Sequence, residues 1–153
     1  SCEYGVKQLE SLIGSGYKID PNQGMDARLV NDSIAKILSR IDWIRFIRFS
    51  CDQKSQIEPV KRAIDHLGRY GVKPYRIFIY LLVTADIQDA ADRVEALKIY
   101  KNINLYAQAE RNERLGIMPN AAQLEFQQRY IYSGRYRLET WQEYCKRRKL
   151  TFI

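Results

Sequence analysis

The chain has 153 residues, 46% of them hydrophobic and 28% charged, with a formal charge of +7, which is typical of one ordinary globular domain with a basic surface. Its three cysteines, Cys2, Cys51 and Cys145, are far apart and show no CxxC or CxxxCxxC spacing. This excludes a disulfide framework and a local metal or iron–sulfur site, and it favours a reducing cytoplasm.

Hydrophobic spacing and caps predict alternating helices and strands along the chain. A helix over residues 6–13 precedes a short strand at 17–20. Asp32 or Ser33 caps a second helix, and the β-branched and aromatic run 43–49 predicts a buried strand. The later elements are a helix between Ser55 and Gly71, a strand at 76–83, a helix at 87–100, a strand at 105–108, a loop at 110–119, and helices at 121–132 and 138–148.

The predicted strands recur about every 30 residues, which is the length of a βα unit and implies parallel pairing. Such units form either half of an eight-unit barrel or most of a small doubly wound sheet. We find no GxGxxG and no Walker loop after any strand, so the barrel is favoured. The expected fold is a partial β/α barrel in one domain over 1–153. It has about four parallel strands within about 1–112 and a helical extension over about 113–153.

No apolar run approaches the roughly 18–20 residues needed to span a bilayer, so we expect no membrane-spanning helix. The chain begins with Ser1, and we expect its natural start to be processed or to lie upstream. The basic run 146–149 leaves open a second interpretation, a module that binds nucleic acid or another polyanion. A third alternative is an interaction domain without chemistry.

Polar residues follow the predicted strands, where β/α barrels bind their ligands. Alternation places Phe46, Arg48 and Ser50 on one side of the second strand. Arg48 needs a partner there, and we expect either Asp26 or Asp52, or a ligand anion. His66 is expected to be a packing or surface residue. With His66 as the single histidine, we expect no Cys/His catalytic pair and no catalytic residue in this chain.

Two motifs at strand ends carry a resemblance: the run from Asn22 to Leu29, NQGMDARL, and the run from Ile47 to Asp52, IRFSCD. In this order, and with the later strand 76–83, they resemble the C-terminal half of the barrel in the radical S-adenosylmethionine (radical SAM) family. The resemblance covers roughly residues 4–112. Family members bind a [4Fe–4S] cluster through a CxxxCxxC loop, and the cluster cleaves S-adenosylmethionine to start radical chemistry.

The resemblance implies that the cluster ligands are absent from this chain, which would be a truncated piece, inactive alone, of a larger enzyme. It also implies roles for eight residues. Those on the S-adenosylmethionine side are Asn22, Gln23, Arg28, Arg48, Ser50 and Asp52. Those on the substrate side are Tyr80 and Gln108. The expected partner is the N-terminal half of the same barrel. Because open sheet edges and faces need cover, we expect either a homodimer through the inner face or edge, or the helices of 120–148 folded over an edge.

Overall fold

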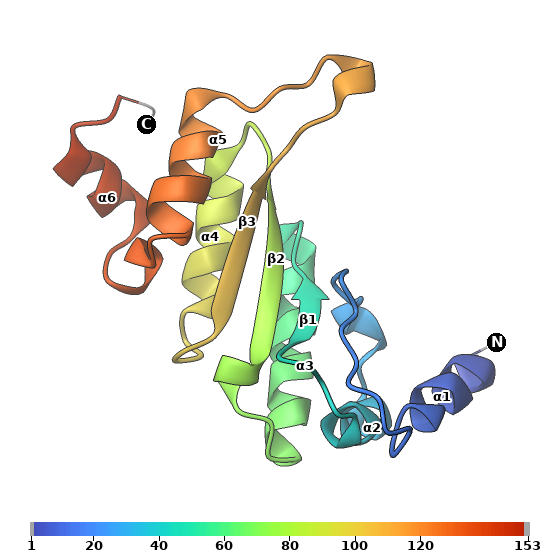
Figure 1. Ribbon diagram of the computed structural model, residues 1–153. Coiled ribbons are helices and arrows are strands. Elements are labelled where there is room, and N and C mark those ends of the chain that lie inside the picture. Colours follow the sequence, from blue (N-terminus) through green and yellow to red (C-terminus); the bar gives the residue numbers. More distant parts are fainter. Residues whose placement is uncertain (1, 152–153) are drawn as a thin grey trace.

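Residues 2–151 are described by a computed structural model, and they form an open, three-stranded parallel sheet (Figure 1). Strands β1 (Ile47–Ser50), β2 (Ile77–Val83) and β3 (Asn104–Ala109) lie side by side in chain order. Helix α3 (Ile57–Arg69) connects β1 to β2, and α4 (Ile87–Leu97) connects β2 to β3. The expected α/β class, with parallel strands alternating with helices, is confirmed.

The other helices lie at the two sides of the sheet (Figure 1). On the β1 side are α1 (Cys2–Ser11) and α2 (Asp32–Arg40). After β3, α5 (Ala121–Glu125) continues into a π-helical turn (Phe126–Ile131), and α6 (Trp141–Arg148) follows. Within residues 2–151, every helix is too short or too polar to cross a membrane.

The strand expected at 17–20 does not form, so the described sheet has three strands and not about four. The segment instead makes two isolated parallel bridges to the chain leading into and through β1, Ile19 with Trp43 and Met25 with Phe49. Pro21 lies between the two bridges and has no backbone N–H to donate. A continuous ladder is therefore interrupted, although the segment still borders β1.

The predicted cap of the second helix was wrong, for a local reason. Asn31, and not Asp32 or Ser33, caps α2, because its Oδ1 accepts from the amide of Ile34 (2.9 Å). The helix expected between Ser55 and Gly71 is confirmed as α3, which begins at Ile57 after a 3-10 turn (Lys54–Gln56). The strand expected to begin at 43 was wrong at its start, because β1 begins at residue 47.

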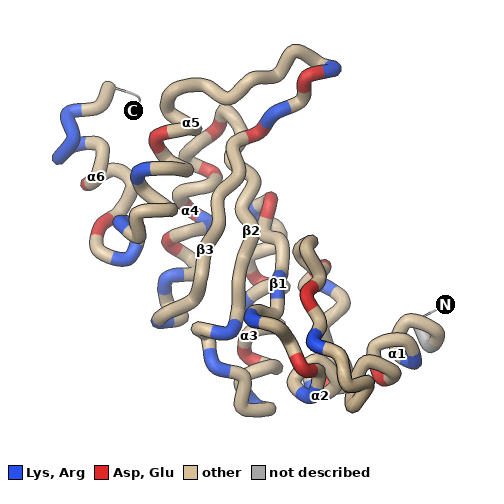
Figure 2. Tube along the Cα trace, viewed as in Figure 1, with Lys and Arg blue, Asp and Glu red and all other residues tan. Residues whose placement is uncertain are grey.

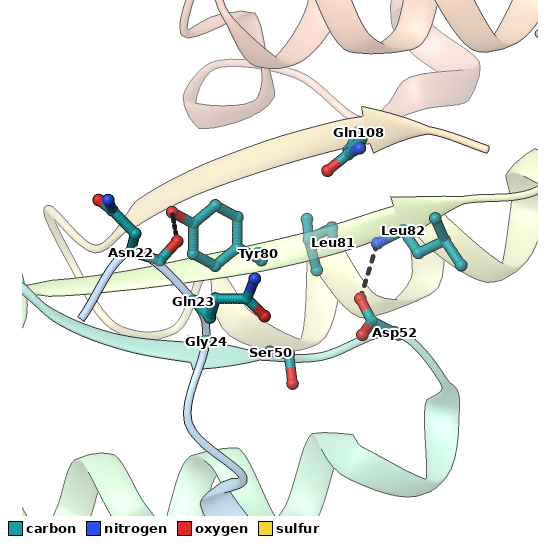
Figure 3. Close-up of a pocket in the computed structure, with 9 residues that line it drawn as sticks. All are labelled: Asn22, Gln23, Gly24, Ser50, Asp52, Tyr80, Leu81, Leu82 and Gln108. Carbon is teal, nitrogen blue, oxygen red and sulfur yellow. Dashed lines mark hydrogen bonds between the residues drawn. The ribbon is translucent and has the colours of Figure 1, made fainter. Parts of the chain in front are cut away.

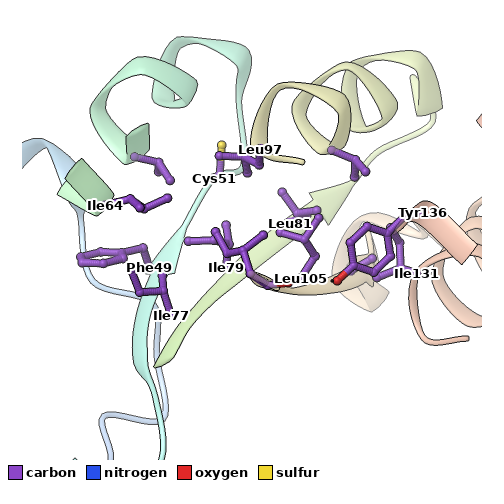
Figure 4. Packing of buried hydrophobic residues seen from close by; sticks show 14 of the residues in the cluster. Phe49, Cys51, Ile64, Ile77, Ile79, Leu81, Leu97, Leu105, Ile131 and Tyr136 are labelled. Carbon is purple, nitrogen blue, oxygen red and sulfur yellow. Dashed lines mark hydrogen bonds between the residues drawn. The ribbon is translucent and has the colours of Figure 1, made fainter. Parts of the chain in front are cut away.

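The two faces of the sheet differ in what covers them. Alternate residues of β2, such as Ile77, Ile79 and Leu81, are fully buried against α3 and α4, which lie behind the sheet (Figures 1 and 4). The residues between them are only half-buried, because no helix of the described chain covers the other face. We call this second side the open face. Arg48 and Ser50 lie on it, as strand alternation predicted.

The C-terminal helical segment covers the outer edge of β3. Its side chains bond the backbone groups that point away from β2, which is how natural sheets protect an edge strand. The bonds run from Tyr132 Oη to the Ala107 carbonyl (2.9 Å), from the Ala109 amide to Gln127 Oε1 (3.2 Å), and from Tyr136 Oη to the Ile103 carbonyl (3.2 Å). The expectation that helices of 120–148 fold over an edge is confirmed.

Arg93, on α4, is completely buried, and sequence reasoning did not single it out. Its guanidinium forms an ion pair with Asp89 (2.7 Å). It also donates to the carbonyls of Cys51 (2.5 Å) and Leu82 (2.8 Å). Arg93 thus ties α4 to the carboxyl ends of β1 and β2, where a buried charge is tolerated only because every partner is in place.

We expect Arg93→Met to lower the free energy of unfolding by about 3–5 kcal/mol, because it leaves Asp89 and two strand carbonyls without their partner. Urea denaturation followed by circular dichroism measures this. The matched control is Arg62→Met, an exposed arginine on α3, which should change stability by less than about 0.5 kcal/mol. Equal effects of the two substitutions would contradict this role of Arg93.

Candidate functional site

A hollow of about 490 Å³ lies on the open face at the carboxyl ends of the strands (Figure 3). Its volume is within the roughly 300–1,000 Å³ of small-molecule sites. It brings together six of the eight residues expected from the sequence. They are Asn22, Gln23, Ser50, Asp52, Tyr80 and Gln108. Gly24, Leu81 and Leu82 complete the lining.

Close contact between Gly24 and β1 holds the Asn22–Gln23 wall in place. A Cβ at Gly24 would lie 2.7 Å from the Ser50 nitrogen and 2.8 Å from the Phe49 carbonyl carbon. Next to it, the amide of Met25 donates to the Arg48 carbonyl (2.8 Å). The segment can pair with β1 at this distance only because residue 24 has no side chain.

The polar groups of the hollow are partly used by the protein itself. Asp52 Oδ1 accepts from the Leu82 amide (3.0 Å), which joins β1 to β2 beyond their last paired residues. The second carboxylate oxygen of Asp52 is the one left for a ligand. Tyr80 Oη donates to the Asn22 carbonyl (3.4 Å), as Figure 3 shows. The hollow therefore offers one carboxylate together with side-chain amides and hydroxyl groups.

The hollow carries little positive charge for a chain of +7. β2 and β3 contain no charged residue, as the uniform colour of both strands shows in Figure 2. Asp52 is the one charged side chain among the lining residues of the described chain. The site therefore suits a neutral or cationic ligand with hydroxyl or amino groups, and not a phosphate.

Arg48 lies beside the hollow but does not line it. Its guanidinium forms an ion pair with Asp20 (2.7 Å) and donates to Asn22 Oδ1 (3.3 Å). The expected partners Asp26 and Asp52 were therefore wrong, and a carboxylate earlier in the neighbouring segment takes their place. Arg48 acts on the hollow indirectly, because it holds the side chain of Asn22.

Arg28 does not reach the hollow. Its exposed side chain forms a bidentate pair with Asp26 (2.7 Å from Nη2 to Oδ2), and Asp26 also accepts from the Arg28 amide. The side-chain hydrogen bond from Arg28 keeps the pKa of Asp26 below its usual value. The pair closes the short turn Ala27–Leu29, which is a local structural role.

Neither Cys51 nor His66 is among the residues that line the hollow. Cys51 is completely buried, and burial raises the pKa of its thiol to about 11. His66 lies at the far end of α3, with Nδ1 3.5 Å from Asp32 Oδ1. Within residues 2–151, no group of three or more histidine, cysteine or acidic side chains could hold a metal ion. The residues described do not fit an iron–sulfur cluster.

The basic run 146–149 is partly engaged in the fold. Arg147 forms an ion pair with Glu139 (2.6 Å), and Arg148 lies 3.7 Å from Glu125. Two of its four charges therefore fasten α6 to neighbouring segments. The run is a weaker candidate for a polyanion site than its sequence indicates.

No family model matches this chain, and no curated protein and no solved structure shows a significant similarity to it.

We expect Gly24→Ala to lower the free energy of unfolding by about 1–3 kcal/mol, because the added methyl group collides with the β1 backbone. Gly68→Ala is the matched control. Its added Cβ meets no atom within 4 Å, and it should raise stability by about 0.4–1 kcal/mol. Thermal or urea unfolding distinguishes the opposite signs. Equal shifts in the same direction would contradict the close approach of Gly24 to β1.

We expect Cys51 to resist alkylation by iodoacetamide in the native protein at pH 8. With a pKa of about 11, only about one thiol in a thousand is ionised at that pH, and the side chain is buried. In urea the same cysteine should react readily, because its pKa returns to about 8.5. Mass spectrometry of the Cys51 peptide measures this, and rapid labelling of the native protein would contradict it.

Proposed function

We propose that this chain forms the later wall of a larger β/α barrel whose cavity binds S-adenosylmethionine for radical chemistry. The observation that supports it most is the hollow at the carboxyl ends of successive parallel strands, which brings together Asn22, Gln23, Ser50 and Asp52. The motifs NQGMDARL and IRFSCD supply these four residues. Two motifs distant in sequence thus border one cavity, as the resemblance requires.

The charge of the hollow is consistent with this ligand. S-adenosylmethionine carries a positive sulfonium, an ammonium group, a carboxylate and a ribose with two hydroxyl groups. The second oxygen of Asp52 can accept from the ribose hydroxyls or the ammonium group, and Ser50 can bond a hydroxyl. Of the remaining predicted contacts, Arg48 contributes by holding Asn22, and Arg28 does not contribute.

The topology also supports a barrel wall. The strands follow one another in chain order and the connecting helices lie behind them, whereas a doubly wound sheet has helices on both faces (Figure 1). The β3 edge is closed by side chains. Segment 17–25 borders β1 through only two isolated bridges, so its far side is where a further strand can add.

An iron–sulfur cluster is not part of what this chain supplies, because the described residues offer no ligand set for one. We place the cluster on the remaining part of the barrel. In this proposal the residues of the two motifs bind and orient the adenosyl ligand. Tyr80 and Gln108, which line the same hollow, are assigned to the substrate side.

Isothermal titration calorimetry of this chain with S-adenosylmethionine tests the proposal. We expect saturable binding that Asp52→Asn weakens about tenfold or more, because a hydrogen bond to a charged group contributes about 1.5–3 kcal/mol. Asparagine keeps Oδ1 for the Leu82 amide, so the fold is preserved. Ser50→Ala should weaken binding about fivefold, which corresponds to one neutral hydrogen bond.

The control is Ser33→Ala, an exposed serine in the first turn of α2, which should leave the affinity unchanged. Absence of binding, or equal affinities for the wild type and both hollow variants, would sink the proposal. ATP serves as a competing ligand. If ATP binds more tightly than S-adenosylmethionine, the hollow is an anion site and the assignment is wrong.

A further inference from the structure

A continuous row of aromatic side chains crosses the open face below the hollow. We call it the aromatic ladder, and its members are Phe46, Phe78, Tyr80, Tyr106 and Tyr132. Neighbouring rings have centroids 5.0–5.7 Å apart, from Phe46–Phe78 (5.3 Å) to Tyr106–Tyr132 (5.0 Å). One member, Tyr80, also lines the hollow, and the ladder ends beyond β3 at Tyr132.

The outer end of the ladder is exposed. Tyr106 is 37% exposed and Tyr132 is 45% exposed, although both lie among other aromatic rings. A second hollow of about 310 Å³ opens here, and Phe78, Asn104, Tyr106 and Tyr132 are among the residues that line it. Contiguous exposed aromatic surface of this kind is typical of binding sites.

Arginines accompany the ladder at both ends. The guanidinium of Arg45 lies 4.7 Å from the centroid of the Phe46 ring. At the other end, Arg137 lines the second hollow and donates to the Ile103 carbonyl (3.4 Å). Among the described residues, neither arginine has a carboxylate within ion-pair distance, in contrast to Arg28, Arg48 and Arg147. Their charge is therefore available to a partner.

We propose that the outer end of the aromatic ladder binds single-stranded nucleic acid. Bases stack on Tyr106 and Tyr132, and Arg137 contacts the phosphate backbone. The Nδ2 of Asn104 already donates to the carbonyls of Tyr75 (2.9 Å) and Ile77 (3.1 Å), so Asn104 offers its Oδ1 as an acceptor to a base edge. The inference names a substrate class for the proposed function. It rests on that function for the chemistry in the hollow. A strand lying along the ladder would present one nucleotide to the hollow through Tyr80.

The sealed edge of β3 keeps this end of the ladder accessible in the larger barrel. Tyr132 and Gln127 occupy the outward backbone groups of Ala107 and Ala109, so no further strand can pair there. Added strands lie beyond segment 17–25, on the opposite side of the sheet. The substrate therefore approaches over β3.

The observations favour nucleic acid over an acidic peptide. The exposed side chains in this region are planar and aromatic, and stacking on such rings suits any base. The site contributes one well-placed cation at the outer end, Arg137. The net positive charge of the whole chain, +7 with Arg137 included, attracts a phosphate strand at longer range. The acidic side chains of such a peptide offer no planar ring that could stack on the tyrosines.

Fluorescence anisotropy with a labelled single-stranded RNA 12-mer, in the absence of S-adenosylmethionine, tests the inference. We expect Tyr106→Ala to raise the dissociation constant about tenfold, through the loss of one stacked base. We expect Arg137→Gln to reduce the slope of log K against log salt by about 0.7, through the loss of one phosphate contact on a single strand. Circular dichroism melts verify that both variants are folded.

Two controls are matched in type. Tyr4→Ala removes an exposed tyrosine on α1, and Lys146→Gln with Lys149→Gln removes two charges of the C-terminal run. Tyr4→Ala should bind RNA as the wild type does. The lysine variant should lose less affinity than Tyr106→Ala, because its two charges act only at longer range. The inference is overturned if Tyr106→Ala and Arg137→Gln bind normally, if the lysine variant loses more affinity than they do, or if an RNA duplex binds equally well.

Competition with polyglutamate separates the two classes of partner. Displacement of the RNA at the same concentration of charge would overturn the inference in favour of an acidic protein. RNA binding without S-adenosylmethionine binding would support the inference as a binding site while removing the proposed function. The reverse result would remove only the inference.

Discussion

The guanidinium of Arg93 is fully buried, and its bonds to the Cys51 and Leu82 carbonyls join α4 to the last residues of β1 and β2. A buried cation is stable only when its partners are fixed, so this group sets the position of both strand ends. On the same level, Asp52 accepts from the Leu82 amide and holds the two strands together past their ladder. Both Asp52 and Leu82 line the hollow. Its floor is therefore made of groups that cannot shift independently, which is the property a small-molecule site needs.

The alternation of side chains across the sheet gives its two faces different tasks. One set, including Ile79 and Leu81, is completely buried against the helices and belongs to the hydrophobic core. The other set includes Ser50 and Gln108, which line the hollow, and Phe78 and Tyr106, which belong to the aromatic ladder. Since β2 and β3 contain no charge, the positive charge beside them lies on residues such as Arg45 and Arg137 and on the helices (Figure 2). The hollow is lined by no cationic side chain, whereas the aromatic surface beside it carries arginines. A small cationic ligand and a large anionic one would therefore bind at different places on the open face.

Six of the eight residues that the resemblance named line the hollow, because they stand at or near the carboxyl ends of parallel strands, which meet at one edge of the sheet. The sequence predicted the partners of the arginines poorly. Arg48 pairs with Asp20 (2.7 Å) because two isolated bridges hold segment 17–25 against β1, and no local pattern indicates that contact. Arg93 was missed because a charged pair at i and i+4, here with Asp89, is normally assigned to the solvent side of a helix. Only the strand carbonyls, 42 and 11 positions away, explain its burial.

The two edges of the sheet differ in whether they can accept a further strand. At β3, side chains from the C-terminal segment occupy the outward backbone groups of Ala107 and Ala109, which ends the ladder of strands. At the other side, Gly24 allows segment 17–25 to approach β1 closely, and Pro21 interrupts the pairing. The segment is therefore joined to β1 by only two isolated bridges. Growth of the sheet is therefore possible beyond that segment and blocked at β3. Because the blocked edge is also where the aromatic ladder becomes exposed, the side that cannot accept a strand is the side that remains open to a partner.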